Sequence, residues 1–222
     1  MLDIYPWQQT LWQQIVMRNQ HAHAYLLHGP AGIGKRVLAN QLAARLLCQQ
    51  PLALAACGEC KSCHLLAAGT HPDFYVLEPE EADKAIKVDQ VRDLVDFVVQ
   101  TPQLGGRKLV LLEPAEAMNP NAANALLKSL EEPAGNTVML LISHQPSRLL
   151  PTVRSRCVQQ ACPLPDETQS LDWMQVAHPE LDRQLAHELL RLSGGSPLTA
   201  LRLRALDVIG LREKVVEGVK KL

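Results

Sequence analysis

The sequence predicts an α/β protein in which helices cover both faces of a parallel sheet, followed by a small all-helical part. Between residues 20 and 162, continuously apolar runs alternate with helical patterns. This alternation is typical of parallel strands that are buried on both faces. After Pro163 only helical patterns remain. We therefore expect an α/β domain over residues 1–163, with a cysteine module inserted at 48–66, and a helical domain over 164–222.

The amino-terminal half of the first domain contains two predicted helices and two predicted strands. Apolar residues at helical spacing predict a helix over residues 8–19, and the apolar run 24–28 predicts a buried strand that ends at Gly29. The pattern over 36–47 predicts a helix that leads into the cysteines, and 73–77 predicts the next strand.

The second half of this domain repeats the alternation of helix and strand. Asp89 is the expected cap of a helix whose apolar face includes Val91, Leu94, Val95, Val98 and Val99. A turn at Gly105-Gly106 and a strand over 108–112 should follow. The last two elements are a helix opened by Asn119-Pro120 and stopped by Glu131-Glu132-Pro133, and a strand over 137–143.

Composition excludes several functional classes. The chain has 222 residues, 47% of them hydrophobic, and a formal net charge of −1, whereas a free-standing DNA-binding protein is usually strongly basic. Aromatic residues make up only 4%, which argues against a base-stacking surface. An acid at position 3 and the absence of an apolar core exclude a signal peptide at the amino terminus. We expect a cytoplasmic protein whose thiols stay reduced.

A glycine-rich loop follows the first predicted strand. Residues 29–35 read Gly-Pro-Ala-Gly-Ile-Gly-Lys, which matches the phosphate loop whose backbone N–H groups cradle phosphates and whose lysine reaches the outer phosphates. The candidate nucleotide-binding residues are Gly29, Gly32, Gly34 and Lys35. The next residue is Arg36, where the motif requires a Ser or Thr hydroxyl that holds magnesium. We therefore expect impaired metal binding and doubtful binding of ATP.

The acidic half of an ATPase site is also altered. Glu113 and Pro114 follow the strand over 108–112, and proline offers no side chain for polarising water. Together with Arg36, this predicts a loop that binds nucleotide weakly at most and hydrolyses it poorly.

Four cysteines predict a metal site. Cys48, Cys57, Cys60 and Cys63 can supply four thiolates to a closed tetrahedral zinc site with a structural role. Three other interpretations stay open, namely a c-type haem attachment at Cys60-Lys61-Ser62-Cys63-His64, an iron–sulfur cluster, and four free thiols. Cys157 and Cys162 stand apart from this motif, and we expect them to be buried packing residues.

Over residues 5–205 the chain resembles the AAA+ subunits of the bacterial replicative clamp loader. The resemblance rests on the phosphate loop, the cysteine module after its helix, the segment 121–133 (Asn-Ala-Ala-Asn-Ala-Leu-Leu-Lys-Ser-Leu-Glu-Glu-Pro), and Ser155-Arg156-Cys157. In this family the motor subunits carry Lys-Thr in the phosphate loop and Asp-Glu after the later strand. This sequence has Lys35-Arg36 and Glu113-Pro114 at these places. The sensing arginine that the motor subunits carry in the helical domain should fall near Leu198 and is missing, and Ser143-His144 occupies the place of the first sensor. These departures match the family's non-hydrolysing subunit.

The resemblance also implies a role and partners. Arg156 matches the arginine that reaches ATP held by a neighbouring motor subunit. The implied partners are the motor (gamma/tau) and delta subunits, with the sliding clamp and primer-template DNA reached through the complex, and no membrane is involved. Members of the family continue into a third, collar-forming helical domain, so we expect that 222 residues hold two domains of three. Two alternatives are an active motor ATPase and a zinc-stabilised nucleic-acid-binding module.

Overall fold

The computed structural model describes residues 3–18, 20–81, 83–104 and 106–220. The chain divides into two compact units. The first comprises residues 1–4, 8–29 and 35–162, and the second comprises residues 5–7, 30–34 and 163–222. Each is described by itself below.

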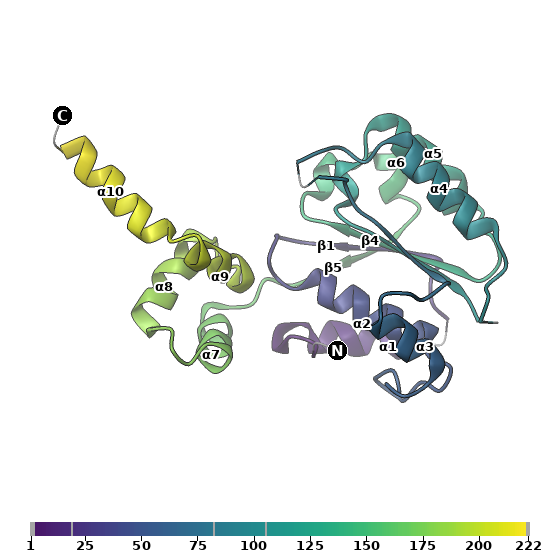
Figure 1. Cartoon of the computed structure of the whole chain (residues 1–222), viewed down its shortest axis with the longest axis horizontal. Helices are drawn as coiled ribbons and strands as arrows, with labels where there is room; N and C mark the ends of the chain where they lie inside the picture. The colour runs from purple at the N-terminus through teal and green to yellow at the C-terminus, as the bar shows by residue number, and fades with distance from the viewer. Residues whose placement is uncertain (1–2, 19, 82, 105, 221–222) are drawn as a thin grey trace. The chain divides into compact units, whose positions relative to one another are not determined.

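A parallel sheet of five strands forms the centre of the first unit (Figure 1). The strands lie in the order β2-β3-β4-β1-β5, and every neighbouring pair is parallel. Their bounds are β1 (Ala24–His28), β2 (Phe74–Leu77), β3 (Lys108–Leu112), β4 (Thr137–Ser143) and β5 (Val158–Ala161). The sheet confirms the α/β class that the alternating pattern predicts.

Helices cover both faces of this sheet (Figure 1). One face carries α1 (Gln9–Val16), α2 (Lys35–Leu47) and α3 (Lys61–Ala67), and the other carries α4 (Val88–Val99), α5 (Pro120–Glu131) and the short α6 (Pro151–Arg154). The chain also contains the short 3-10 helices η1 (Pro6–Gln8), η2 (Ala115–Ala117) and η3 (Pro146–Arg148).

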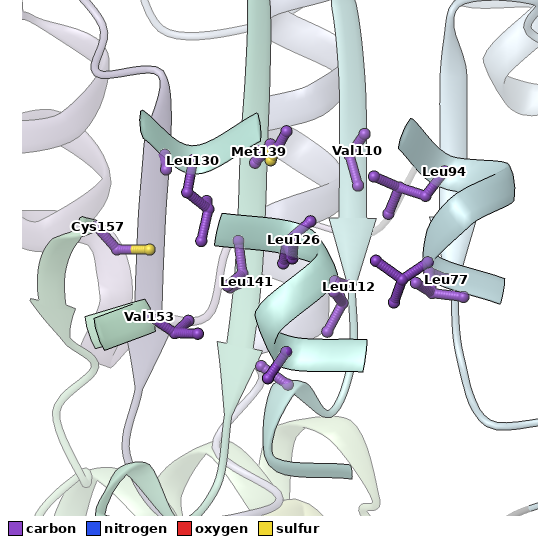
Figure 2. Packing of buried hydrophobic residues seen from close by; sticks show 14 of the residues in the cluster. Leu77, Leu94, Val110, Leu112, Leu126, Leu130, Met139, Leu141, Val153 and Cys157 are labelled. Atoms are coloured by element: carbon purple, nitrogen blue, oxygen red, sulfur yellow. The ribbon is translucent and has the colours of Figure 1, made fainter. Parts of the chain in front are cut away.

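The hydrophobic core under α4 and α5 explains the spacing of their apolar residues. Figure 2 shows Leu126 and Leu130 of α5 and Leu94 of α4 beside the strand residues Val110 and Met139. All five side chains are at most 1% exposed. Alternate residues of β1, β3 and β4 enter this core, and the others point to the opposite face of the sheet, which is why these central strands read as continuous apolar runs.

The start of α4 differs from the prediction. The helix begins at Val88 with Lys87 as its N-cap, so the predicted Asp89 cap is wrong by two residues. The backbone N–H of Lys87 donates to Gln90 Oε1 at 2.9 Å, and Asp89 instead pairs with Arg92 on the helix surface. Val99, predicted on the apolar face, is 65% exposed because the helix ends there.

The other helix boundaries agree better with the sequence. Asn119 caps α5 as predicted, since its Oδ1 accepts a hydrogen bond from the N–H of Ala122 at 2.8 Å. Two elements were not expected, namely α3 within the cysteine module and the polar edge strand β5. The predicted turn at Gly105-Gly106 falls partly on Gly105, which lies outside the described residues.

The second unit is helical after Pro163. It contains α7 (Glu167–Ala177), α8 (Arg183–Leu192), α9 (Pro197–Ala205) and α10 (Val208–Lys220). A small core, including Leu171, Met174 and Leu189, joins α7, α8 and α9. Across the described ranges, no helix is long and apolar enough to cross a membrane.

Candidate functional site

Lys35 opens α2 at the carboxyl end of β1, where a phosphate loop places its lysine. Its Nζ donates to the carbonyl oxygen of Gly29 at 2.7 Å. Burial lowers the pKa of Lys35 to about 8, and nearby Cys162 and Glu113 act in the opposite direction. The side chain is thus folded back on the first residue of the loop.

Residues 30–34 of the loop belong to the compact unit that contains α9. The Ser196 hydroxyl donates to the carbonyl oxygen of Ala31 at 2.7 Å. The N–H of Leu198 donates to the carbonyl oxygen of Gly32 at 3.1 Å. A Cβ at Gly32 would lie 2.2 Å from Thr199 Oγ1, and Gly32 has a φ of +72°, so this position admits only glycine. Leu198, where the resemblance places a sensing arginine, contacts the loop through its backbone.

Arg36 forms an ion-paired cluster with two carboxylates of the first unit. Its Nη1 donates to Glu113 Oε2 at 2.7 Å and also pairs with Glu78 Oε1. Burial by itself would lower the pKa of Arg36, but the hydrogen bonds to Glu113 and Glu78 outweigh it and raise that pKa. The guanidinium therefore sits at the residue position of the missing metal-binding hydroxyl and neutralises the acid expected near the metal.

The end of β4 is tied to the same region. Ser143 is fully buried, and His144 Nε2 lies 3.8 Å from Glu113 Oε1. Glu116 fixes this turn, because its Oε1 accepts hydrogen bonds from the N–H groups of His144 and Gln145 at 2.8 and 3.0 Å. Of the two residues predicted for a first sensor, His144 thus lies beside Glu113.

Arg156 lies away from these residues in the chain, after α6. Its Nε donates to Glu131 Oε1 at 2.7 Å, and its Nη1 donates to the carbonyl oxygen of Thr152 at 2.9 Å. The side chain of Arg156 remains 31% exposed and that of Glu131 is 49% exposed. The end of α5 therefore orients a guanidinium that still reaches solvent.

The four predicted cysteines converge. Their Sγ atoms all lie within 4.8 Å of one another, so the group of Cys48, Cys57, Cys60 and Cys63 can hold a metal ion. The closest Sγ–Sγ distances are 3.4 Å for Cys48–Cys57 and 3.5 Å for Cys60–Cys63, which are much longer than a disulfide bond of about 2.05 Å. Backbone N–H groups of Glu59 and Cys60 lower the pKa of Cys57.

A buried chain of hydrogen bonds, which sequence reasoning missed, anchors this module. The N–H of Asp73 donates to His71 Nδ1 at 3.0 Å, which leaves the ring hydrogen on Nε2 to bond Ser62 Oγ at 2.8 Å. Ser62 in turn donates to the carbonyl oxygen of Leu47 at 2.7 Å. The chain of bonds joins α3 to the end of α2 and to the start of β2.

Comparison with known proteins identifies the family. Residues 6–164 match the family model described as "DNA polymerase III, delta subunit". The DNA polymerase III subunit delta' of Pseudomonas aeruginosa is 72% identical over 222 residues, which cover 100% of this chain and 68% of that protein. This chain belongs to the delta-prime family of DNA polymerase III subunits. The delta-prime subunit of Escherichia coli is 37% identical over 97% of this chain and 65% of its own length. The chain thus spans about two thirds of the length of its delta-prime relatives.

Solved structures agree with a clamp-loader-like AAA+ fold for this delta-prime family member. A DNA polymerase III gamma-subunit-related protein of Thermotoga maritima has a TM-score of 0.61 at 26% identity, covering 93% of this chain and 62% of its own. The RuvB Holliday junction branch migration motor of the same organism has a TM-score of 0.52 at 16% identity, over 92% of this chain and 61% of its own. The second match concerns the fold alone.

The structure thus brings together some predicted residues of this delta-prime chain and adds others. It gathers the four cysteines, and it pairs Arg36 with Glu113. It adds Glu78, Glu116 and Glu131, which sequence reasoning missed. Glu78 directly follows β2 and Glu113 directly follows β3, and these two strands are parallel neighbours. An acid after each of two strands was therefore the feature of the sequence that could have indicated that Glu78 lies near Glu113.

Proposed function

We propose that this chain is a non-hydrolysing clamp-loader subunit that assembles with ATPase motor subunits and helps to load the sliding clamp on primed DNA. The observation that carries the proposal is the pairing of Arg36 with Glu113 and Glu78. In a working site, a hydroxyl and an acid hold magnesium against the terminal phosphates. Here a guanidinium, which cannot coordinate a cation, bonds the acid instead. Pro114 supplies no catalytic base beside it.

The positive contribution of the chain would be Arg156, donated in trans to ATP on a neighbouring motor subunit. An arginine placed this way stabilises the charge that develops on the transferred phosphate and accelerates hydrolysis by about 10³–10⁵ in related enzymes. Two features of Arg156 support this role. Its side chain is partly exposed, and its present partner Glu131 is half-exposed. An ion pair of that kind contributes only about 0–1 kcal/mol, so exchanging Glu131 for a phosphate costs little.

The family names and the resemblance suggest the partners. We propose the motor (gamma/tau) and delta subunits as direct neighbours, with the clamp and primer-template DNA contacted through the complex, in the cytoplasm. The DNA-directed polymerase activity belongs to the whole assembly. Within the chain, residues 1–163 would serve as the AAA+ domain and 164–222 as the helical lid domain.

We propose structural zinc as the ion of the cysteine module. A tetrahedral site with zinc–sulfur bonds of about 2.3 Å has sulfur–sulfur edges of about 3.8 Å. The Sγ–Sγ distances Cys48–Cys60 and Cys57–Cys63 are both 3.9 Å, close to that value. Two backbone N–H groups donate to these sulfurs, from Cys57 to Cys48 Sγ and from Cys60 to Cys57 Sγ, as they do in thiolate sites. Four protein ligands leave no position for a reacting water.

The first test uses the isolated chain. We expect negligible magnesium-dependent ATP hydrolysis at protein concentrations that would reveal a slow motor subunit. Robust turnover that Lys35→Ala abolishes would show an active motor ATPase instead.

The second test uses the reconstituted loader with clamp and primed DNA. Arg156→Ala should leave assembly intact, since the Arg156–Glu131 pair contributes little to stability. It should lower DNA-stimulated ATPase by at least the share of one motor site. Arg148→Ala is the matched control, because Arg148 is a nearby exposed arginine bonded only to Gln145 within the described residues. ATPase activity equal to wild type in the Arg156→Ala complex would remove the trans role.

A further inference from the structure

Four basic side chains lie at the end of the sheet that is formed by the amino termini of its strands, opposite to the phosphate loop. We refer to this end of the sheet below as its edge. Arg18 follows α1, His21 precedes β1, and Arg107 directly precedes β3. Helix α2 starts after β1 and returns antiparallel to the strands it covers, so Arg45 in its last turn reaches the same edge. We call these residues the edge cluster.

The edge cluster lies on the α2 face of the sheet. Val110 enters the core on the α4 face, so by strand alternation Leu109, and with it Arg107, points to the α2 face. The same alternation directs Tyr25 toward α1 and α2, because Leu26 enters the opposite core. Consistent with this placement, the charges of Arg107, Arg45 and Arg18 act on His21: burial contributes most to lowering the pKa of His21, and these three charges lower it further.

Two members of the cluster are held in place by Tyr25 and Gln160. The guanidinium carbon of Arg18 lies 5.7 Å from the centroid of the Tyr25 ring, and its Nη2 donates to Gln160 Oε1 at 2.8 Å. Tyr25 Oη accepts from the N–H of Ala22 at 3.0 Å and lies 3.2 Å from His21 Nδ1. If the tyrosine hydrogen points to Nδ1, the ring hydrogen of His21 lies on Nε2, from which it can be donated to a ligand. The cluster is thus built largely of preoriented donors.

No acid of the described residues pairs directly with the arginines of the cluster. Within the described ranges, Arg18, Arg45 and Arg107 take part in no ion pair. Asp73, the acid beside the start of neighbouring β2, is buried, and its two oxygens accept from the N–H groups of Gln103 and Leu104. Burial and the charge of Arg45 both lower the pKa of Arg107, so the two guanidiniums repel one another.

One donor of the cluster lacks an acceptor altogether. The Nε of Arg45 is buried and has no hydrogen-bond partner among the described residues. A buried donor without a partner costs free energy, and native structures rarely leave one. An anion at this edge would satisfy Arg45 Nε and relieve the repulsion at once.

We propose that the edge cluster is a binding site for a phosphate group, separate from the phosphate loop. Guanidinium groups match the oxygen geometry of phosphate through paired N–H donors, and they do so better than lysines. The phosphate can belong to the backbone of a nucleic acid or can be a free ion. The two sources share this chemistry, and the experiment separates them.

The test uses the full 222-residue chain in buffer without phosphate or sulfate, and two probes, inorganic phosphate and a short single-stranded oligothymidylate. Calorimetry gives the affinity, and the NMR signals of the His21 ring report binding at this edge. We expect saturable shifts of these signals with at least one probe. Arg45→Gln and Arg107→Gln should each weaken that binding about tenfold or more, because each removes a bond between charged groups. Arg18→Gln, at a partly exposed position, serves if either variant fails to fold.

Two control variants assign the site. Arg92→Gln removes an exposed arginine on α4 that pairs with Asp89, and Lys35→Met disables the phosphate loop; both should leave the His21 shifts unchanged. Saturation with inorganic phosphate identifies a site for the free ion, and saturation with the oligonucleotide alone identifies a nucleic-acid backbone. The proposal fails if neither probe shifts His21, if the arginine variants bind as wild type does, or if only Lys35→Met abolishes binding.

Discussion

Replacing Arg36 with threonine tests the idea that a guanidinium takes the role of the metal ion. Arg36→Thr restores the hydroxyl of an intact phosphate loop and removes the cation between Glu113 and Glu78. Two carboxylates are then left close together without their positive partner. The variant should therefore lose stability, and it should gain affinity for magnesium.

The contacts set the size of the loss. The Arg36–Glu113 bond joins charged groups at 2.7 Å, and the Glu113 side chain is only 16% exposed, so its loss costs about 1.5–3 kcal/mol. The Glu78 side chain is half-exposed, and its pair adds about 0–1 kcal/mol. We expect a total of about 1.5–4 kcal/mol, which lowers the melting temperature of a chain of this size by about 3–16 °C.

The assay is thermal unfolding of both proteins over a series of magnesium concentrations. Magnesium should not shift the melting temperature of the wild type, because Arg36 competes for the same carboxylate. It should stabilise Arg36→Thr by about 1.4 kcal/mol at ten times the dissociation constant. Adding Glu113→Gln to the variant should recover part of the lost stability and abolish the magnesium effect, since the uncompensated charge is gone.

Arg92→Thr is the control, because Arg92 forms an exposed pair with Asp89 whose side chains are 68% and 79% exposed. Its loss should cost less than about 0.5 kcal/mol. The reasoning is refuted if Arg36→Thr is as stable as this control, or if magnesium stabilises wild type and variant equally.

Two further predictions concern the thiols and Lys35. In the zinc-loaded native chain no cysteine should react rapidly with a thiol reagent at pH 8. The metal holds four of them, and burial raises the pKa of Cys157 to about 12 and that of Cys162 to about 11. A chelator should make four thiols reactive and a denaturant all six, whereas rapid reaction of Cys157 or Cys162 in the native chain would contradict this. Lys35 has a pKa of about 8 in the folded chain, against about 10.4 when unfolded. Between these values the folded state has released a proton that the unfolded state keeps, so stability rises with pH. The unfolding free energy of wild type minus that of Lys35→Met should therefore increase from pH 8 to 9, as chemical denaturation would measure, and a constant difference would count against the buried charge.

The central strands could be predicted from sequence because burial on both faces leaves a continuous apolar run. Residues 108–112 and 137–143 are buried along their whole length. Strand β5 (Val-Gln-Gln-Ala) escaped detection because it lies at the sheet edge with most of its side chains exposed. Its strand character comes from pairing with β1, a tertiary contact that local composition does not encode.

The candidate site was predictable only in part. Arg36 stood out because it breaks a motif of fixed spacing. Its partner Glu78 is 42 residues away and follows a different strand, so spacing along the chain gave no indication of the contact. The same holds for Arg156 and Glu131, which are 25 residues apart. Such pairs are set by which strands and helices become neighbours in the sheet.

The pairing of Arg36 with Glu113 has a consequence for how this centre responds to its surroundings. A magnesium ion occupies a site in proportion to its concentration and leaves when the nucleotide leaves. A guanidinium attached to α2 cannot diffuse away, so the charge beside Glu113 stays the same whether cellular magnesium and ATP are scarce or abundant. In the proposed assembly, this chain would therefore keep the same local charge through each round of nucleotide exchange by its neighbours.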